Sequence, residues 1–179
     1  MRRKSIRFCI VALLSLLLIA GCKQENNQFK ILIFSSLPEE ALEEMKGLAK
    51  EEVESSLEFN ISKYPPVSER LIVEIVRHSG DILIMDRELL AAIYDSEELY
   101  NLVEFQNDEN KIALTSFELE ALMADGEITE PVDVYDNALK IIGLKTYLIE
   151  SEPVELVAVI PKYIENPKTA FAVIEKLVQ

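Results

Sequence analysis

The chain has 179 residues, of which 32 are acidic and 18 basic, so its formal net charge is −14. So acidic a surface repels nucleic acid and anionic lipid, which argues against both as partners. The length fits one folded domain with a core of its own, held without disulfides.

The N-terminus has the layout of an export signal. Residues 1–8 carry four basic side chains and no acid, and residues 9–20 carry no charge. That apolar run is shorter than the roughly 20 residues a membrane-spanning helix needs. Leu18-Ile19-Ala20-Gly21-Cys22 resembles the lipobox of bacterial lipoproteins, in which the cysteine sulfur is lipidated and becomes the new N-terminus. An ordinary signal peptide that ends beside a chance cysteine is the alternative.

The lipobox resemblance implies a signal peptide over residues 1–21, a lipid on Cys22 and a polar tether over residues 22–28. Acyl chains on Cys22 would anchor the chain to the cell membrane on its extracytoplasmic face, because each buried methylene contributes about 0.8 kcal/mol. The mature chain keeps 14 basic and 32 acidic residues, a formal charge of −18. Since Cys9 leaves with the leader, no free thiol remains, and we expect no cofactor and no metal.

Residues 29–179 are expected to form one α/β domain. An apolar run over 31–34 predicts a buried strand, and Ser36 with Glu39 predicts a capping box for the helix that follows. Pro38 fits the first turn of that helix. Its expected inward residues are Leu42, Met45, Ala49 and Val53. Alternation over residues 57–64 predicts a second strand, ended by Pro65-Pro66.

A second helix is predicted over residues 67–80, with a left-handed Gly80 at its end and Leu71, Ile72, Ile75 and Val76 facing inward. Residues 81–86 predict a third strand, after which Asp86 can cap a third helix. This β-α-β-α-β-α order predicts a mostly parallel sheet flanked by helices, with right-handed crossovers.

The second half is less regular. Thr115 with Glu118 predicts a helix over residues 117–124, ended by Asp125-Gly126, although a hairpin fits the same residues. Strands are predicted over 138–144 and 155–161. Asn166-Pro167 opens a last helix, whose inward residues are expected to be Phe171, Ile174, Leu177 and Val178.

Three segments, residues 30–51, 79–105 and 155–179, resemble parts of the type 2 extracellular solute-binding proteins of bacterial ABC transporters. The last of these is similar to the returning strand of that family and its Asn-Pro-x-x-Ala helix. The resemblance implies a single lobe of the periplasmic-binding-protein kind. Members usually have two full lobes, whereas this mature chain has 158 residues, no tryptophan and few aromatic residues. We therefore expect a reduced form, with a shallow cleft open on one side.

Candidate ligand-binding residues follow from the sheet. In open parallel sheets, ligands sit beyond the carboxyl ends of the strands. That rule selects Ser35 and Ser36 after the first strand, Tyr64 after the second, and Asp86 with Arg87 after the third. Ser36 and Asp86 are equally explained as helix caps, and Tyr64 as a cover for the sheet edge.

No catalytic constellation is complete in the sequence, so we expect no enzyme. His78 is the single histidine and lies where a helix C-terminus stabilises it through the dipole. No G-x-S-x-G elbow is present. The acid-rich residues 107–110 lack the spacing of a calcium loop.

These observations favour a lipid-anchored extracytoplasmic domain that binds a small solute or belongs to a transporter-associated assembly. The alternative is an accessory lipoprotein that contacts other proteins and has no small ligand. Residues 39–54 place seven glutamates on one predicted helix, which indicates a solvated face or a docking surface for a basic protein partner.

Overall fold

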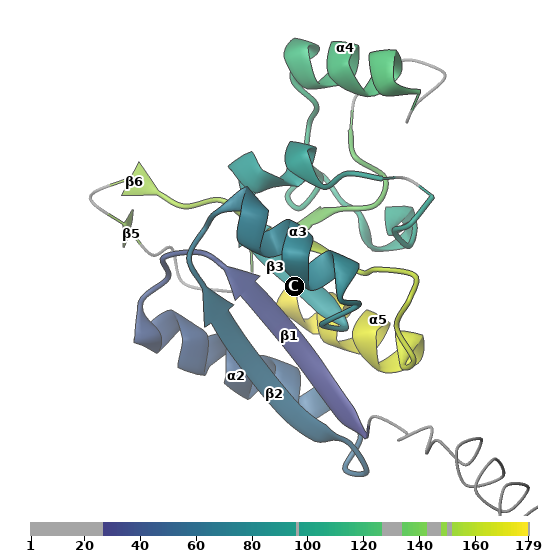
Figure 1. Cartoon of the computed structure of the whole chain (residues 1–179). Helices are drawn as coiled ribbons and strands as arrows, with labels where there is room; N and C mark the ends of the chain where they lie inside the picture. Colours follow the sequence, from purple (N-terminus) through teal and green to yellow (C-terminus); the bar gives the residue numbers. More distant parts are fainter. Residues whose placement is uncertain (1–26, 96, 127–133, 143–147, 150–151, 179) are drawn as a thin grey trace, which may run out of the picture.

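The computed structural model describes residues 27–95, 97–126, 134–142, 148–149 and 152–178. The predicted signal peptide, Cys22 and most of the predicted tether lie outside the described residues. The described part is a five-stranded sheet with helices on both faces, accompanied by a separate two-stranded ribbon (Figure 1).

The first half of the chain alternates strands and helices as predicted. Its elements are β1 (Gln28–Phe34), α2 (Glu39–Glu52), β2 (Glu58–Tyr64), α3 (Ser68–Val76), β3 (Ile82–Asp86) and a 3₁₀ helix, η1 (Arg87–Ala92). The second half contains η2 (Val103–Phe105), α4 (Ser116–Asp125), β4 (Leu139–Lys140), β5 (Leu148–Ile149), β6 (Glu152–Pro153), β7 (Leu156–Val159) and α5 (Pro167–Leu177).

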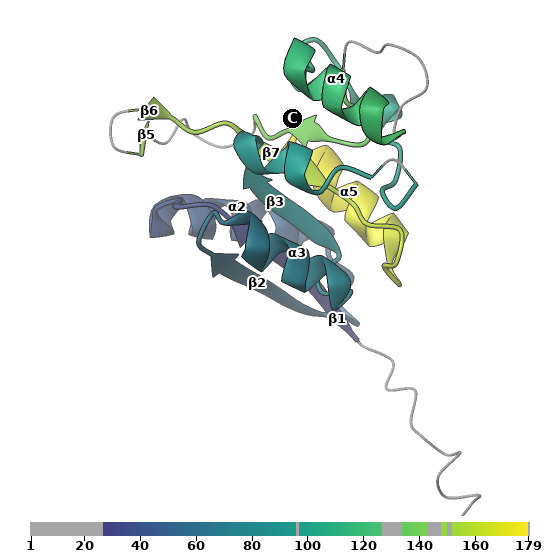
Figure 2. The same cartoon turned by 45° about the horizontal axis from the view of Figure 1, so that its top comes forward.

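The main sheet has the strand order β2-β1-β3-β7-β4. β1 pairs in parallel with β2 on one side and with β3 on the other. The chain therefore steps from β1 to β2 and then back past β1 to β3. Right-handed crossovers in opposite directions put their helices on opposite faces of a sheet. Accordingly, α3 lies in front of the sheet and α2 behind it, together with α5 (Figures 1 and 2).

The prediction of a mostly parallel sheet needs correction at β7, which runs antiparallel to both β3 and β4. The sheet is mixed. The physical reason lies in the long excursion between β3 and β7: Asp86, where β3 ends, pairs with Leu156, where β7 begins. The chain leaves the sheet at the carboxyl end of β3 and re-enters it beside that same end. A neighbouring strand that starts there has to run in the direction opposite to β3.

Two apolar layers cover the sheet. Alternate residues of β1 point to opposite faces: Ile31 and Ile33 pack with α2 and α5, whereas Leu32 and Phe34 pack with Leu71 of α3. All five side chains are at most 3% exposed. Each such fully buried side chain stabilises the fold by about 1.5–3 kcal/mol. The continuous apolar run in β1 is therefore explained by burial on both faces.

The predicted capping box at Ser36 does not form. Pro38 has an extended backbone (φ −67°, ψ 160°), α2 begins at Glu39, and no side chain caps it. Ser36 is exposed, while Leu37 is buried at 2% exposure. The chain thus inserts Leu37 into the core before the helix starts, and this separates Ser36 from the first turn.

The inward face of α3 also differs from the prediction. Leu71 is buried as expected, but Ile72 is 44% exposed and Val76 is 75% exposed. In their place the helix buries Glu74, whose carboxylate lies 2.6 Å from Arg70 and 3.7 Å from Arg77. Ion pairing makes the burial of this carboxylate tolerable. Because Glu74 faces inward, Ile72 and Val76 face the solvent.

Gly80 adopts the predicted left-handed conformation, with φ at 87°. A Cβ at this position would lie 2.7 Å from the Leu32 side chain, so only glycine fits. The open choice between helix and hairpin after Thr115 is settled as a helix. Thr115 and Glu118 form a reciprocal capping box for α4, and Gly126 ends it in the left-handed region.

Three further predictions have mixed outcomes. Asp86 precedes a 3₁₀ helix rather than an α-helix, and its side chain forms no cap. Of the strand expected over 138–144, Leu139–Lys140 is a strand and residues 143–144 lie outside the described part. α5 begins at Pro167 as predicted; Ile174, Leu177 and Val178 are buried, and Phe171 packs beside the core.

Candidate functional site

The carboxyl ends of β1 and β3 lie side by side, because Phe34 pairs with Met85 in parallel register. The next residues along the two strands are Ser35 and Asp86. Ser35 is completely buried, and neither its Oγ nor Asp86 Oδ1, which is also buried, has a hydrogen-bond partner outside this pair among the described groups. Such orphaned polar atoms are uncommon in protein interiors and need an explanation.

Burial raises the pKa of the Asp86 carboxyl, and the neighbouring Ser35 hydroxyl opposes that shift. The negative charge of Glu88 adds a smaller upward effect. Asp86 is therefore a carboxyl group whose charged form lacks full solvation. A donor from a bound molecule could supply that solvation.

Arg87 is held in place by α4. Its Nη1 donates to Glu118 Oε1 at 2.7 Å, and its Nη2 donates to Glu118 Oε2 at 2.9 Å and to the Ala113 carbonyl at 3.1 Å. A bidentate pair of this kind is the strongest arrangement that arginine and carboxylate form. The guanidinium is consequently neutralised inside the protein, and its main role is to fix the start of α4 against η1.

Glu118 completes this link through its own capping box. Burial alone would raise the pKa of Glu118, but hydrogen bonds from Arg87 and Thr115 prevail and lower that pKa to about 2. Glu118 thus stays ionised through the whole physiological range.

Tyr135 belongs to the same group, although the sequence did not single it out. Its side chain is 1% exposed, its hydroxyl has no hydrogen-bond partner among the described groups, and the Arg87 guanidinium lies 5.2 Å from its ring centroid. Burial, and then the charge of Glu118, raise the pKa of Tyr135. The only available signal was a large aromatic residue within the polar stretch Asp133 to Asn137, which also fits an ordinary turn.

We call Ser35, Asp86, Arg87, Glu118 and Tyr135 the carboxyl-edge cluster. A cavity of about 650 Å³ adjoins it, open to solvent and formed by η1, the start of α4 and the approach to β7. Its polar lining comes from Arg87, Glu88, Thr115, Glu118 and Glu155, and Phe117 stands at its margin with 80% exposure. The cavity is open to solvent, as expected for a one-sided cleft, and the shallow depth and the reduced lobe stay predictions.

Of the five predicted ligand-binding residues, the fold brings Ser35, Asp86 and Arg87 together. Ser36 is exposed to solvent beyond the strand end. The Tyr64 ring stacks on Phe34 at 5.2 Å, and the Arg70 guanidinium lies 4.4 Å from its centroid. Tyr64 therefore covers the sheet edge, as the alternative interpretation had it.

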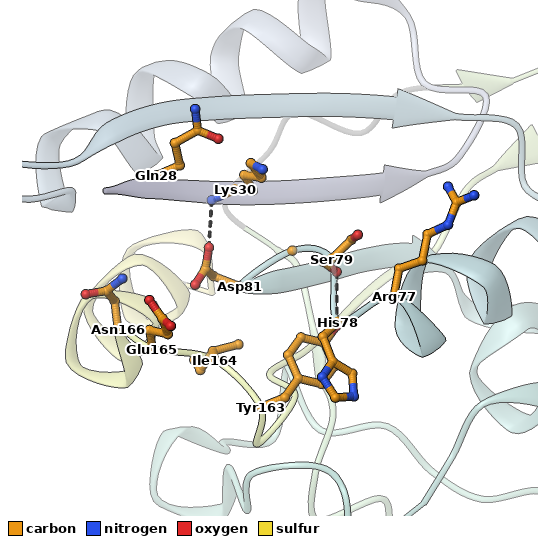
Figure 3. A pocket seen from close by; sticks show the side chains of 11 residues that line it. Gln28, Lys30, Arg77, His78, Ser79, Asp81, Tyr163, Ile164, Glu165 and Asn166 are labelled. Atoms are coloured by element: carbon orange, nitrogen blue, oxygen red, sulfur yellow. Dashed lines mark hydrogen bonds between the residues drawn. The ribbon is translucent and has the colours of Figure 1, made fainter. Parts of the chain in front are cut away.

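A second cavity, of about 340 Å³, lies at the opposite edge, where β1 and β3 begin (Figure 3). There Asp81 Oδ2 accepts a hydrogen bond from the Lys30 amide at 2.8 Å, and the Tyr163 hydroxyl donates to the Ser79 carbonyl at 3.0 Å. The His78 ring stacks on Tyr163 at 4.6 Å. These contacts fix the turn between α3 and β3, so the polar groups have structural partners.

His78 lies two residues after the end of α3, in the left-handed region with φ at 53°. It is at the opposite edge of the sheet from Ser35 and Asp86, so the fold does not assemble these three residues into a triad. Within the described ranges, no three His, Cys, Asp or Glu side chains come together in a way that could hold a metal ion.

Comparison with known proteins adds a similarity to part of a bacterial lipoprotein. No family model matches the chain. A Bacillus subtilis (strain 168) protein described as "Putative lipoprotein YteS" is 26% identical over 102 residues, which cover 55% of this chain. The aligned part spans 56% of that protein's own length, just over half.

Among solved structures, a cysteine mutant of OxyR from Corynebacterium glutamicum covers 93% of this chain and 70% of its own, with 12% identity and a TM-score of 0.36. None of the helices among the described residues has the length and the apolar composition that a membrane span requires. The chain is thus similar, over about half its length, to a bacterial lipoprotein.

Proposed function

We propose that the chain is a lipid-anchored extracytoplasmic binding protein. Two observations support the anchor: the lipobox that ends at Cys22, and the similarity to the Bacillus subtilis lipoprotein. On this proposal residues 1–21 are removed on export, and lipid on Cys22 holds the domain at the outer face of the cell membrane.

We further propose that the domain is a reduced solute-binding lobe. The segment that resembles the family's returning strand is β7, which comes back to the sheet beside β3 after the excursion over residues 87–155. In the resembling family this excursion would hold a second lobe. Here its described part contributes α4 and a few short strands, so the ligand would be covered on one side only.

The observation that carries solute binding is the pair Ser35 Oγ and Asp86 Oδ1, which are buried at adjacent strand ends and have no hydrogen-bond partner outside the pair among the described groups. The next residue, Arg87, lines an open cavity of about 650 Å³. Cavities of about 300–1,000 Å³ are typical of small-ligand sites. Arg87 is already neutralised by Glu118, and the other acidic residues of the lining, Glu88 and Glu155, remain as acceptors, Glu155 beside its ion pair with Lys140. The cavity is therefore suited to a small polar solute that donates hydrogen bonds through hydroxyl or amino groups.

A thermal-shift screen of sugars, amino acids, oligopeptides and metal ions tests this proposal. Binding to the folded state raises the melting temperature by mass action. We expect a hit to be weakened at least tenfold by Asp86→Asn, because the amide replaces one acceptor with a donor. Asp81→Asn is the matched control, since Asp81 is a half-buried carboxyl at the opposite edge.

A hit that is equally weakened by both variants would contradict binding at the carboxyl-edge cluster. The absence of any response across the panel would contradict a small ligand altogether.

The second candidate function, an accessory lipoprotein that contacts other proteins, has its own supporting observation. α2 carries six glutamates and two lysines, and its outward side chains are exposed. A basic protein partner could dock on this surface, with an association that weakens as salt rises. Pull-down from detergent extracts at low and high salt tests it: a partner retained equally at both would contradict an electrostatic contact. On neither proposal is the chain an enzyme.

A further inference from the structure

α3 presents an aliphatic face to solvent. Val76 is 75% exposed, Ile72 is 44% exposed and Val73 is 40% exposed, whereas Glu74 between them is buried with 5% exposure. A solvent-facing helix normally shows the reverse arrangement. A contiguous exposed apolar patch on the surface of a domain often marks a site that contacts a protein, a membrane or a ligand.

An apolar groove continues this face. It has a volume of about 320 Å³ and lies between α3 and the segments that follow η1 and β7. The helix contributes Ile72, Ile75 and Val76, and the facing wall includes Ile93, Leu99 and Pro161. We call the exposed side of α3 and this groove the α3 face.

Charge is distributed unequally between the two sides of the sheet. α2, on the far side from α3, carries six glutamates against two lysines. On the near side, α3 and its C-cap Arg77 carry two glutamates and two arginines, and Glu74 is paired with both Arg70 and Arg77. The facing wall of the groove adds Asp95 and Glu98, so the near side is also acidic, but less so than α2. A bilayer with anionic lipids would therefore repel the α2 side more strongly than the α3 side.

With the proposed lipid on Cys22, a short tether would hold the edge of the sheet where β1 begins close to the bilayer. β1 begins at Gln28, and Gln28, Arg77 and His78 line the same cavity (Figure 3). The start of the domain and the end of α3 therefore share one edge of the sheet. Five residues lie between Cys22 and Gln28, and even a fully extended chain spans only about 20 Å from one to the other.

We propose that the α3 face is the membrane-contacting surface of the lipid-anchored protein. Ile72 and Val76 enter the headgroup region, the largely exposed Arg77 lies at the level of the lipid phosphates, and the acidic α2 side points away from the membrane. This inference rests on the proposed lipid anchor at Cys22, because the bare domain with its strong negative charge would not be drawn to an anionic surface.

Site-directed spin labelling of the lipidated chain tests the inference. The mature protein is purified from membranes, and its mass first verifies the lipid on Cys22. Since Cys9 is lost with the leader and Cys22 is blocked, an introduced cysteine is the single thiol. Val76→Cys reports on the α3 face, and Glu40→Cys, an exposed position at the start of α2, is the matched control.

Both variants are labelled with a nitroxide and placed in vesicles of phosphatidylethanolamine and phosphatidylglycerol. We expect the label at position 76 to be relaxed mainly by lipid-soluble oxygen, and the label at position 40 mainly by a water-soluble nickel complex. Ile72→Cys, measured in the same way, should follow position 76.

Equal access of the nickel complex to positions 40 and 76 overturns the inference. Shielding at position 76 that grows with protein density in the vesicles also overturns it, because it indicates a second copy as the occupant. A purified chain without lipid on Cys22 refutes the anchor itself before any label is measured, so the two failures are distinguishable.

Discussion

The ion pair between Arg87 and Glu118 gives the most quantitative prediction. Their charged atoms lie 2.7 Å apart, and the side chains are 18% and 12% exposed. The folded-state pKa of Glu118 is about 2, against an ordinary value of 4.5. At about 1.4 kcal/mol for each pH unit, that gap corresponds to about 3 kcal/mol. Because solvent still reaches the pair and screens it, we expect about 1–2 kcal/mol in practice.

The perturbation is Glu118→Gln, and the assay is urea unfolding followed at several pH values. A carboxyl whose pKa is depressed on folding contributes stability above its unfolded pKa and loses it as pH falls toward the folded pKa. The variant should therefore be less stable than the parent by about 1–2 kcal/mol near neutral pH. This difference should shrink as pH falls from about 4.5 toward about 2.

Comparing the two proteins at each pH cancels the titration of the other acidic residues. Glu120→Gln is the matched control, because Glu120 is an exposed residue of the same helix. Hydrogen exchange of the α4 amides shows whether the lost stability is local. A Glu118→Gln protein as stable as the parent at neutral pH would refute the reasoning, and so would a deficit that stays constant down to pH 2.

Two further predictions concern single residues of the fold. Gly80→Ala should destabilise the protein by roughly 1–3 kcal/mol in urea unfolding, because the residue has φ at 87° and a Cβ would meet Leu32 at 2.7 Å. Gly47→Ala, in the middle of α2 with no atom within 4 Å of the new Cβ, should instead stabilise it by about 0.5–1 kcal/mol; equal effects of the two changes would contradict the assigned backbone. Tyr135→Phe should change the melting temperature little, since the buried hydroxyl has at most a weak hydrogen bond to the Glu118 carboxylate. A loss of about 1 kcal/mol or more there would show that the hydroxyl forms a bond.

The sequence predicted the strands and helices best where one physical signal dominates. Residues 31–34, 82–85 and 156–159 are strands buried on both faces, and their unbroken apolar runs identify them. Asn166-Pro167 correctly predicted the start of the last helix, α5. The capping-box residues Thr115 and Glu118 indicated α4, although only the structure decided between a helix and a hairpin.

Failures occurred where tertiary contacts override local patterns. Residues 71–76 are almost uniformly apolar, so periodicity could not tell which side faces the core, and the buried ion pairs of Glu74 decided it. Ser36 has the right spacing for a cap, but burial of Leu37 moves the helix start. The reversed direction of β7 depends on where the excursion over residues 87–155 returns, which no local pattern encodes.

The candidate site was predicted in part for the same reason. The rule for strand ends correctly brought Ser35, Asp86 and Arg87 to one place, because it depends only on the order of the parallel strands. The rule could not predict that Glu118 neutralises Arg87, or that Tyr135 lies beside the Arg87 guanidinium. Both partners come from the excursion over residues 87–155, outside the parallel strands.

The central claim is that this acidic domain works outside the cell on a lipid anchor, and the mass of the mature chain tests it most directly. Protein recovered from the membrane fraction should lack residues 1–21 and carry acyl chains on Cys22. Cys22→Ala should keep its leader and carry no acyl chains. Recovery of the parent protein from the cytosol, unlipidated and with its first 21 residues in place, would contradict the claim.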